Sequence, residues 1–312
     1  MKYSLNRFYD AIGVSRQGVH DMLNRMQRNF ERELTILHMI ELIRENHPTM
    51  SLRSLYIKIQ PQGLGRDKFI RMCISHGLKA EVPRNMRRTT NSNGVIRFPN
   101  LLKGIEIVRV NQAWLSDITY FEIGDKFYYI TLIMDAYSRY IKGYSASGSL
   151  RTERTTIPAM KMALKEKDLP EKMIFHSDGG GQYYCQEVIR LTSKMKMQNS
   201  MAKEAYENPF AERINGTIKN CYLKHWSIGT LEQLEKSLDR AVRLYNYDKP
   251  HKSLQGSTPA QLEGRTYIRN GQTAKGEESL TARLITSGAS SPLVIGQTAK
   301  GSDVHPARGN ER

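Results

Sequence analysis

The sequence has few cysteines and no long hydrophobic run. Its three cysteines, Cys73, Cys185 and Cys221, lie far apart and form no Cys-x-x-Cys pair, which argues against a disulfide framework and against a zinc site built on cysteine. We expect them to be buried or inert thiols. No apolar run approaches the ~18 residues of a membrane span, and the N-terminus lacks the apolar segment of a signal peptide. These absences predict a globular, cytoplasmic protein.

Positive charge is in excess and unevenly distributed. The 312 residues carry 47 Lys and Arg against 31 Asp and Glu, a formal net charge of +16. Lys and Arg that neutralise phosphates supply most of the non-specific affinity for nucleic acids. Residues 1–100 hold 17 basic and 8 acidic side chains, so +9 of the +16 lies in the first third of the chain. This favours a nucleic-acid-binding front end over the alternative, a generally basic solvated surface.

Residues 1–32 have the pattern of a helix-turn-helix segment. Gly13 marks a turn, Ser15 is the expected N-cap, and the apolar residues that follow recur at helical spacing. The expected core face consists of Val19, Met22, Leu23 and Met26. The opposite side carries residues that can reach DNA bases or phosphates, namely Arg16, Gln17 and His20. Two helices joined by a glycine turn also occur in any small helical bundle, so that alternative stays open.

A second helical DNA-binding unit is predicted over residues 33–80. Its expected parts are a helix over about 33–45, a break at His47-Pro48-Thr49, a helix over 51–59 and a helix over 66–78. The last helix begins with Arg66, Lys68 and Arg71, and the positive end of a helix also favours phosphate. A basic linker over 81–107 follows, in which we expect three more DNA-binding residues: Arg84, Arg87 and Arg88.

The pattern changes to α/β over residues 108–263. Three alternating runs, VNQAWLSDITYFEI, KFYYITLIMDAYS and RYIKGYSAS, predict an antiparallel meander of three strands. The remaining elements are expected to be a helix over about 151–167, the strand MIFH, a helix over about 184–195, a short strand near 196–200, and helices over about 209–225 and 231–246. Residues 264–312 lose periodicity and repeat GQTAKG, which predicts a flexible tail without assigned function.

Three separated carboxylates are candidates for one site. Asp117 interrupts an apolar strand, Asp178 ends a strand before three glycines, and Glu212 lies on a helix that Asn208 should cap and Pro209 should begin. Each alone has an ordinary explanation as a surface residue. If the three carboxylates lie close together, divalent cations are needed to neutralise their repulsion. Mg²⁺ prefers such oxygen ligands, and two bound Mg²⁺ ions can promote the transfer of a phosphodiester bond.

The helix that carries Glu212 is expected to be amphipathic. At 100° per residue the predicted core face comprises Phe210, Ile214, Ile218 and Cys221. Glu212 and Lys219 differ by about 20° and point the opposite way, which predicts that they share one exposed stripe.

Several ordered blocks resemble one known family. WLSDITY, LIMDAYSRYIKGY, HSDGGGQYY, SMAKEAYENPFAERINGTIK and YNYDKPHKSL followed by STPAQL are similar to the successive blocks of the insertion-sequence-3 family of transposases, at the OrfB product. The resemblance covers about residues 35–263. It implies a retroviral-integrase-like core with an RNase H-like α/β fold, preceded by a mainly helical DNA-binding region, in a prokaryotic protein that works at the nucleoid.

The resemblance also implies an activity and its residues. Asp117, Asp178 and Glu212 correspond to a catalytic Asp-Asp-Glu triad that binds two Mg²⁺, for which Mn²⁺ can substitute. Such a triad carries out nicking at the 3′ ends of the element and strand transfer, both at its inverted repeats. Lys219 matches the basic residue that contacts the element end, and Asp135 matches a position whose usual role is structural. His176 and Gln182 are then expected either beside the metal site or near DNA, or in plain packing.

The chain departs from the family pattern in two places. The usual 35 residues between the second Asp and the Glu are 33 here, and we expect the deletion in the loop before Asn208. The His-His-Cys-Cys zinc pattern of retroviral integrases does not occur in the sequence. DNA binding would then rest on the helical units.

Alternative functions and several partners remain open at this point. A nuclease of the same fold that only hydrolyses DNA, or a non-catalytic sequence-specific DNA-binding protein, would share much of the pattern. For a transposase the expected partners are double-stranded DNA, as terminal repeats and as target, and further copies of the chain, because synapsis of two ends requires a dimer or larger assembly. An upstream helix-turn-helix protein is a further candidate partner, unless residues 5–28 supply that role.

Overall fold

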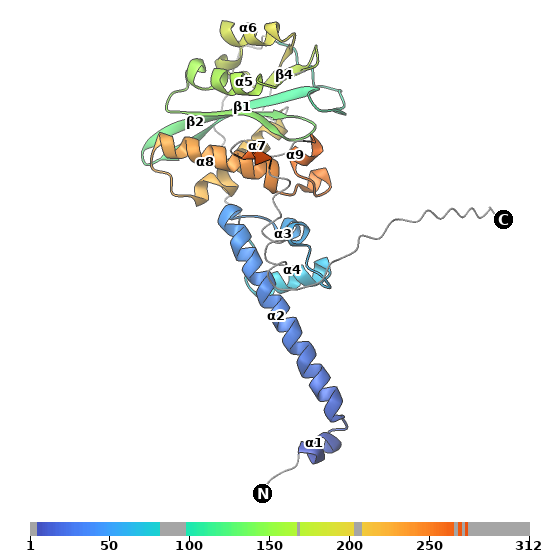
Figure 1. The fold of residues 1–312 in the computed structure, drawn as a ribbon. Helices are drawn as coiled ribbons and strands as arrows, with labels where there is room; N and C mark the ends of the chain where they lie inside the picture. Colours follow the sequence, from blue (N-terminus) through green and yellow to red (C-terminus); the bar gives the residue numbers. More distant parts are fainter. Residues whose placement is uncertain are drawn as a thin grey trace, which may run out of the picture. The chain divides into compact units, whose positions relative to one another are not determined.

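A computed structural model describes residues 5–81, 98–166, 169–202, 208–264, 268–269 and 272–273 (Figure 1). The chain divides into two compact units, Met1–Ala274 and Lys275–Arg312, and the second lies outside the described residues. Most of the tail expected over 264–312 also lies outside them. Two short strands, β6 (Ile268–Arg269) and β7 (Gln272–Thr273), pair with each other. None of the helices in the described ranges is both long and apolar enough to cross a membrane.

A five-stranded mixed sheet forms the centre of the second half of unit 1. Its strands are β1 (Ala113–Ile123), β2 (Lys126–Asp135), β3 (Ile141–Ser147), β4 (Ile174–Ser177) and β5 (Gln198–Met201), in the spatial order β3-β2-β1-β4-β5. β1, β2 and β3 pair antiparallel, whereas β4 pairs parallel with β1 and with β5. Gly124 makes the tight turn between β1 and β2 with φ 56°. The predicted meander is confirmed.

Helices cover both faces of this sheet, as Figure 1 shows. α5 (Thr156–Ala163) and α6 (Gln186–Lys194) pack on one face, and α7 (Pro209–Cys221), α8 (Leu231–Arg243) and α9 (Pro259–Leu262) lie on the other. Successive residues of a strand point to opposite faces, so Trp114 joins the core under α5 and α6 while Leu115 joins the core under α7 and α8. By the same alternation Asp117 faces α7.

The N-terminal part of unit 1 is helical. Its helices are α1 (Leu5–Ala11), α2 (Arg16–Asn46), α3 (Leu52–Ile59) and α4 (Arg66–Ser75). The prediction of separate helices up to 28 and from 33 was wrong, because α2 is continuous over 31 residues. No glycine or proline lies between Val19 and Asn46 to end the helix. A boundary between residues 32 and 33 therefore falls inside a helix.

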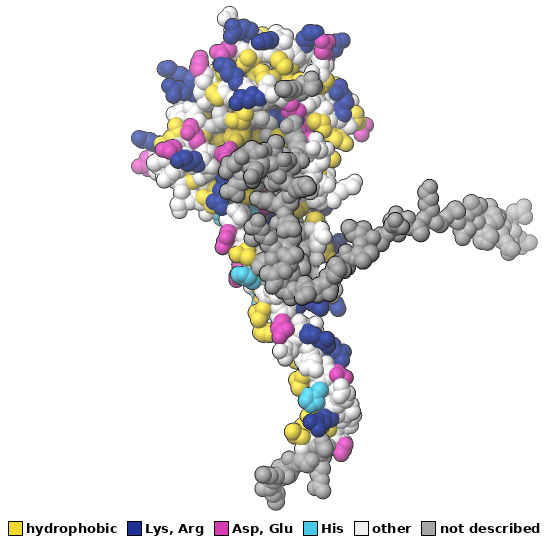
Figure 2. All heavy atoms as spheres, viewed as in Figure 1, with side chains coloured by type: hydrophobic (Ala, Val, Ile, Leu, Met, Phe, Trp, Pro, Cys, Tyr) yellow, Lys and Arg dark blue, Asp and Glu magenta, His cyan; other side chains and the backbone are white. Residues whose placement is uncertain are grey.

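The apolar face predicted for the first helical segment is not a core face in this structure. Met22, Leu23 and Met26 are 49%, 51% and 60% exposed, and hydrophobic side chains appear on the surface along this part of α2 in Figure 2. The helical core begins about three turns later, where Ile36, Met39, Ile40 and Ile43 of α2 pack with α3 and α4. Helical spacing locates an apolar face but does not say what covers it.

A cluster of buried charges connects the segment after α9 to strand β3 and the β2–β3 turn. The ammonium of Lys142 on β3, whose side chain is 1% exposed, lies 2.9 Å from a carboxylate oxygen of both Glu166 and Glu263. The Ser138 hydroxyl, which has one proton to donate, lies within hydrogen-bond distance of Glu263 and, at 3.0 Å, of Asp135. Asp135 also accepts the backbone N–H groups of Asn111, Tyr137 and Ser138. These contacts give Asp135 and Glu263 a structural role: they hold the β2–β3 turn and the end of α9 together.

Removing the cation of this cluster should destabilise the core. Lys142→Met removes the ammonium that neutralises two carboxylates of the cluster, and breaking a buried ion pair costs about 3–5 kcal/mol. Thermal unfolding should fall by at least about 6 °C. Lys236→Met, which removes the exposed ion pair with Glu232 on α8, is the matched control and should leave the midpoint unchanged. Equal midpoints for the two variants would contradict the structural role.

Candidate functional site

Three elements position the candidate acids around the middle of the sheet. Asp117 lies within β1, opposite Leu132 of β2. Asp178 follows directly after the last residue of β4, the parallel neighbour of β1. Glu212 lies in the first turn of α7, on the face of the sheet toward which Asp117 points. The strand that ends at Asp178 therefore lies beside the strand that carries Asp117.

The charges of the other two acids act on the carboxyl of Asp117. Burial raises the pKa of Asp117 to about 7, and the charges of Asp178 and Glu212 add to that rise. Hydrogen bonds from Asn215 and from the backbone N–H of Ile118 oppose it. Burial also raises the pKa of Asp178, against a 3.1 Å hydrogen bond from the backbone N–H of Gly180. The site has more negative charge than its surroundings neutralise.

Asn215 links the acid-bearing helix to the acid-bearing strand. Its amide nitrogen donates to Oδ2 of Asp117 at 2.8 Å, while the backbone N–H of Ile118 donates to Oδ1 at 2.9 Å. Both oxygens of Asp117 are thereby oriented. Asn215 was not among the residues predicted from the sequence. Its position three residues after Glu212 places both on neighbouring points of α7, and that spacing was the available clue.

A second layer of polar contacts holds the strand beneath the site. Asn208 is the N-cap residue of α7, but its side chain makes no cap hydrogen bond. It is 5% exposed and donates instead to the backbone carbonyl of Ser116 on β1 at 3.2 Å. The Ser116 hydroxyl lies 3.0 Å from the hydroxyl of Tyr183, a fully buried phenol whose pKa is raised well above its usual value by burial and by the two aspartates. The Asn208 side chain therefore holds the start of α7 against β1 instead of capping the helix.

Lys219 does not share an exposed stripe with Glu212. It is 5% exposed, and its ammonium donates to the hydroxyl of Thr119 and the carbonyl of Tyr120, both at 3.2 Å. The same ammonium lies 4.7 Å from the Tyr120 ring. Burial and the charge of Lys224 lower its pKa. The prediction of an outward-facing Lys219 was wrong, because a long side chain on the edge of the core face can reach across to the strand.

Phe210 also departs from the predicted core face of α7. Its side chain is 41% exposed, and the guanidinium of Arg139 from the β2–β3 turn lies 3.9 Å from its ring centre. The buried face of α7 consists of Ala211, Ile214, Asn215, Ile218, Lys219 and Asn220. The helix rests on the sheet through a stripe that is partly polar.

The glycine-rich loop is shaped around Asp178. A Cβ on Gly180 would lie 3.0 Å from Oδ1 of Asp178 and 3.0 Å from the Gln182 amide oxygen, so a larger residue there would have to displace these side chains. Gln182 is half-buried and donates to the Leu150 carbonyl at 3.4 Å. His176 is fully buried, and its Nδ1 lies 2.8 Å from the hydroxyl of Ser200 on β5. For His176 the packing alternative describes the observed contact.

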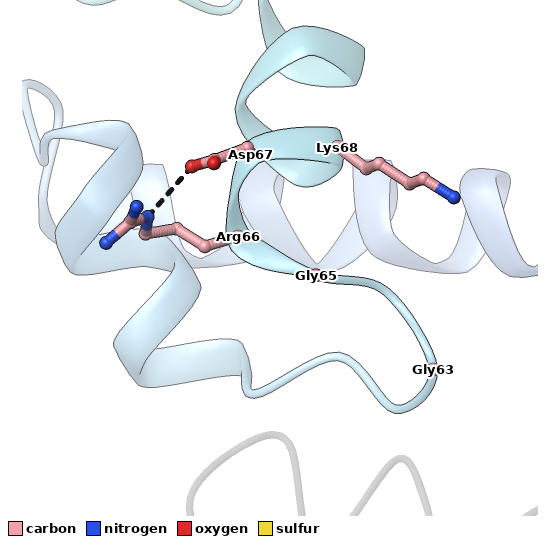
Figure 3. A pocket seen from close by; sticks show the side chains of 5 residues that line it. All are labelled: Gly63, Gly65, Arg66, Asp67 and Lys68. Atoms are coloured by element: carbon pink, nitrogen blue, oxygen red, sulfur yellow. Dashed lines mark hydrogen bonds and ion pairs between the residues drawn. The ribbon is translucent and has the colours of Figure 1, made fainter.

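The residues expected to bind DNA lie on two parts of the helical region. Arg16, Gln17 and His20 are exposed in the first turns of α2. Arg66, Lys68 and Arg71 are exposed on α4, where an open pocket of about 410 Å³ lies at the helix start. In Figure 3 Arg66 faces Asp67, 3.0 Å away, and Lys68 points away from both. Arg84, Arg87 and Arg88 lie outside the described residues, as do residues 203–207, where the two-residue deletion was expected.

The donor chemistry of the three acids fits a hard cation. Within the ranges that the structure describes, no three His, Cys, Asp or Glu side chains are close enough together to hold a metal ion as they stand. Carboxylate oxygens are nevertheless the ligands that Mg²⁺ and similar ions prefer. The raised pKa of Asp117 records a cost that a positive charge at this place would relieve.

Comparisons with known proteins agree with this architecture. Residues 108–206 and 193–259 each match a family described as an integrase core domain. The chain is 31% identical over 264 residues to the insertion element IS600 uncharacterized 31 kDa protein of Shigella sonnei, covering 80% of this chain and 95% of that protein. It is 26% identical over 235 residues to the transposase for insertion sequence element IS629 of Shigella sonnei, covering 73% of this chain and 78% of that protein.

Two further similarities are more partial. The transposase InsF for insertion sequence IS3A of Escherichia coli is 26% identical over 158 residues, which cover 50% of this chain and 54% of that protein. Among solved structures, the HTLV-2 integrase catalytic core domain in complex with magnesium aligns with a TM-score of 0.40 at 21% identity, over 48% of this chain and 95% of that one.

Neutralising Asp117 should stabilise the metal-free protein at high pH. The folded-state pKa of Asp117 is raised from 3.8 to about 7, so the unfolded chain releases this proton first. The stability that the group contributes is present below pH ~4 and is lost as the pH rises to ~7. In chelator, Asp117→Asn should therefore unfold several degrees above the parent at pH 8 and equal it near pH 4. Glu235→Gln, at an exposed carboxylate, is the control. A pH-independent difference would contradict this reasoning.

Replacing Lys219 should affect stability more than DNA affinity. Lys219→Met keeps the aliphatic stem against Tyr120 and removes the ammonium that β1 binds, so the unfolding midpoint should fall without DNA present. The slope of log affinity against log salt should stay unchanged, since each lost phosphate contact would reduce it by about 0.9. Lys68→Met on the exposed side of α4 is the matched comparison. If only the Lys219 variant showed a reduced slope, Lys219 would be a DNA contact after all.

Proposed function

We propose roles for the individual residues of this site on the premise that the chain belongs to the insertion-sequence-3 family of transposases, with an integrase core domain. The protein is a DDE-type transposase. Its mixed five-stranded sheet between two helical layers is the RNase H-like fold of integrase cores. The reaction class is therefore transfer of DNA phosphodiester bonds.

Asp117, Asp178 and Glu212 are the proposed catalytic triad. The single observation that carries this assignment is that the charges of Asp178 and Glu212, from a different strand and a helix, both act on the carboxyl of Asp117. These three side chains would hold two Mg²⁺, or Mn²⁺ in their place. Two such ions, when bound, supply activation of the attacking oxygen and stabilisation of the leaving oxygen.

The neighbouring side chains have supporting roles in this proposal. Asn215 and the N–H of Ile118 each donate to one oxygen of Asp117, which keeps the carboxylate in one orientation. Gly180 lets the backbone pass close to Asp178 and donate to it. Tyr183 remains a neutral phenol at physiological pH because its pKa is raised well above 10. It therefore adds no charge beneath the acids.

DNA is the proposed substrate, both as element ends and as target. In nicking, water attacks phosphorus and the bond to the 3′ oxygen breaks, which leaves a 3′ hydroxyl. In strand transfer that hydroxyl attacks a target phosphodiester and displaces its 3′ oxygen. The exposed basic residues of the helical region would hold the phosphates, with Arg16, Gln17 and His20 on α2 and Arg66, Lys68 and Arg71 on α4. Joining two ends requires more than one copy of the chain.

Strand-transfer assays on the element's own ends test the triad. With Mg²⁺, the parent should cut an end-containing duplex and join the new 3′ end to target DNA. Asp117→Asn, Asp178→Asn and Glu212→Gln should each lose at least about 10³-fold in rate while keeping DNA affinity, because the carboxylates act in the transition state. Glu235→Gln is the control and should retain full activity. Activity retained by any one triad variant would remove that residue from the site.

The same assay separates the remaining alternatives. Cut products without joined products, even when 3′-hydroxyl ends are supplied, would identify a nuclease. Binding without any cutting would identify a DNA-binding protein.

A further inference from the structure

The helical region and the integrase core meet in a polar contact built from distant parts of the chain. His47, just after α2, is 2% exposed, and its Nε2 lies 2.6 Å from a carboxylate oxygen of Asp248. Lys58 on α3 forms an ion pair with the other oxygen of Asp248 and lies 3.4 Å from its backbone carbonyl. One carboxylate of the core thus binds two cationic or donor groups of the helical region.

The same histidine reaches the helix that carries the proposed catalytic glutamate. Its Nδ1 lies 3.0 Å from the hydroxyl of Tyr222, the C-cap residue of α7. A carboxylate only accepts hydrogen bonds, so Nε2 of a neutral His47 donates to Asp248 and Nδ1 accepts from Tyr222. Burial lowers the pKa of His47, which favours this neutral form. The contacts form one relay from Tyr222 through His47 to Asp248 and Lys58.

Further contacts fix the same surface. The hydroxyl of Ser54 donates to the carbonyl of Pro250 at 3.4 Å, and Arg240 on α8 donates to the side chain of Asn46 at 2.8 Å. Gly256 packs so closely on Ile57 that a Cβ there would lie 3.3 Å from its methyl group. Asp248 itself ends a π-helix, Leu244–Asp248, that continues α8. Such wide turns are irregular and recur at functional positions.

We propose that His47, Lys58 and Asp248 form a latch that fixes the helical region, with the DNA it holds, relative to the acid-bearing helix α7. In this role they are positioning residues that touch neither metal nor substrate. They determine which phosphodiester of the bound DNA reaches Asp117, Asp178 and Glu212. The inference rests on the proposed function, because it assumes that the helical region binds DNA and that the core cuts it.

The position of the nick tests the latch directly. Asp248→Asn in the full-length chain keeps the shape of the side chain and removes the charge that holds Lys58. It should bind the element end with unchanged affinity, cut it about 10- to 100-fold more slowly, since misplacement by ~1 Å costs that much, and spread its nicks over neighbouring phosphodiesters. Lys58→Met removes the other half of the same ion pair and should spread the nicks in the same way.

A destabilised control separates positioning from mere loss of stability. Leu238→Ala truncates a buried residue of α8 that is 1% exposed, and should lower the thermal unfolding midpoint by several degrees. It should reduce the yield while leaving the nick at the parental phosphodiester. If Asp248→Asn also cuts at the parental position only, the latch has no positioning role and the proposal is overturned.

Hydrogen exchange provides a readout that does not depend on catalysis. Without DNA, Asp248→Asn should exchange faster than the parent in α3 and around His47, and Leu238→Ala should not. A parent that fails to cut its own element end refutes the proposed function, and the exchange result then still decides whether the contact joins the two regions. Unchanged exchange in Asp248→Asn would refute the latch even if the parent is active.

Discussion

The docking of α7 on β1 through polar side chains is the interaction on which the site depends. Asn208, Asn215 and Lys219 each donate to β1, at Ser116, at Asp117, and at Thr119 and Tyr120 respectively. Apolar contacts alone would allow the helix to slide, because hydrophobic burial has no direction. Hydrogen bonds to successive residues of one strand set its register. Glu212 therefore has a defined place relative to Asp117.

This docking also explains how a half-buried strand tolerates an acid. Asp117 has two hydrogen-bond donors, Ile118 and Asn215, yet its pKa remains raised because burial and two neighbouring carboxylates outweigh them. The fold holds the carboxyl in place and leaves its charge uncompensated. Functional sites characteristically combine such structural support with an unfavourable electrostatic balance.

Much of the core could be predicted from the sequence, because its signals are local and strong. Alternating runs separated by Gly124-Asp125 gave the meander, and the ordered blocks gave the family and the fold. The continuous α2 was missed because the segment was divided into two helical units although no glycine or proline lies between Val19 and Asn46. Lys219 and Asn208 were predicted wrongly because their side chains bind residues of β1. Helical periodicity shows which side of a helix a residue lies on, but not which distant residue its side chain contacts. Whether the three acids bind metal together remains a prediction.

The charge cluster around Lys142 has a consequence for biosynthesis. One of its two carboxylate partners, Glu263, lies 121 residues later in the chain, just beyond the last helix of the core. Until residue 263 of the nascent chain has emerged, the ammonium of Lys142 can pair only with Glu166. Burying Lys142 at that stage would leave it without its second carboxylate. Domains form from the N-terminal side during translation. This core is therefore completed only when nearly all of it has left the ribosome.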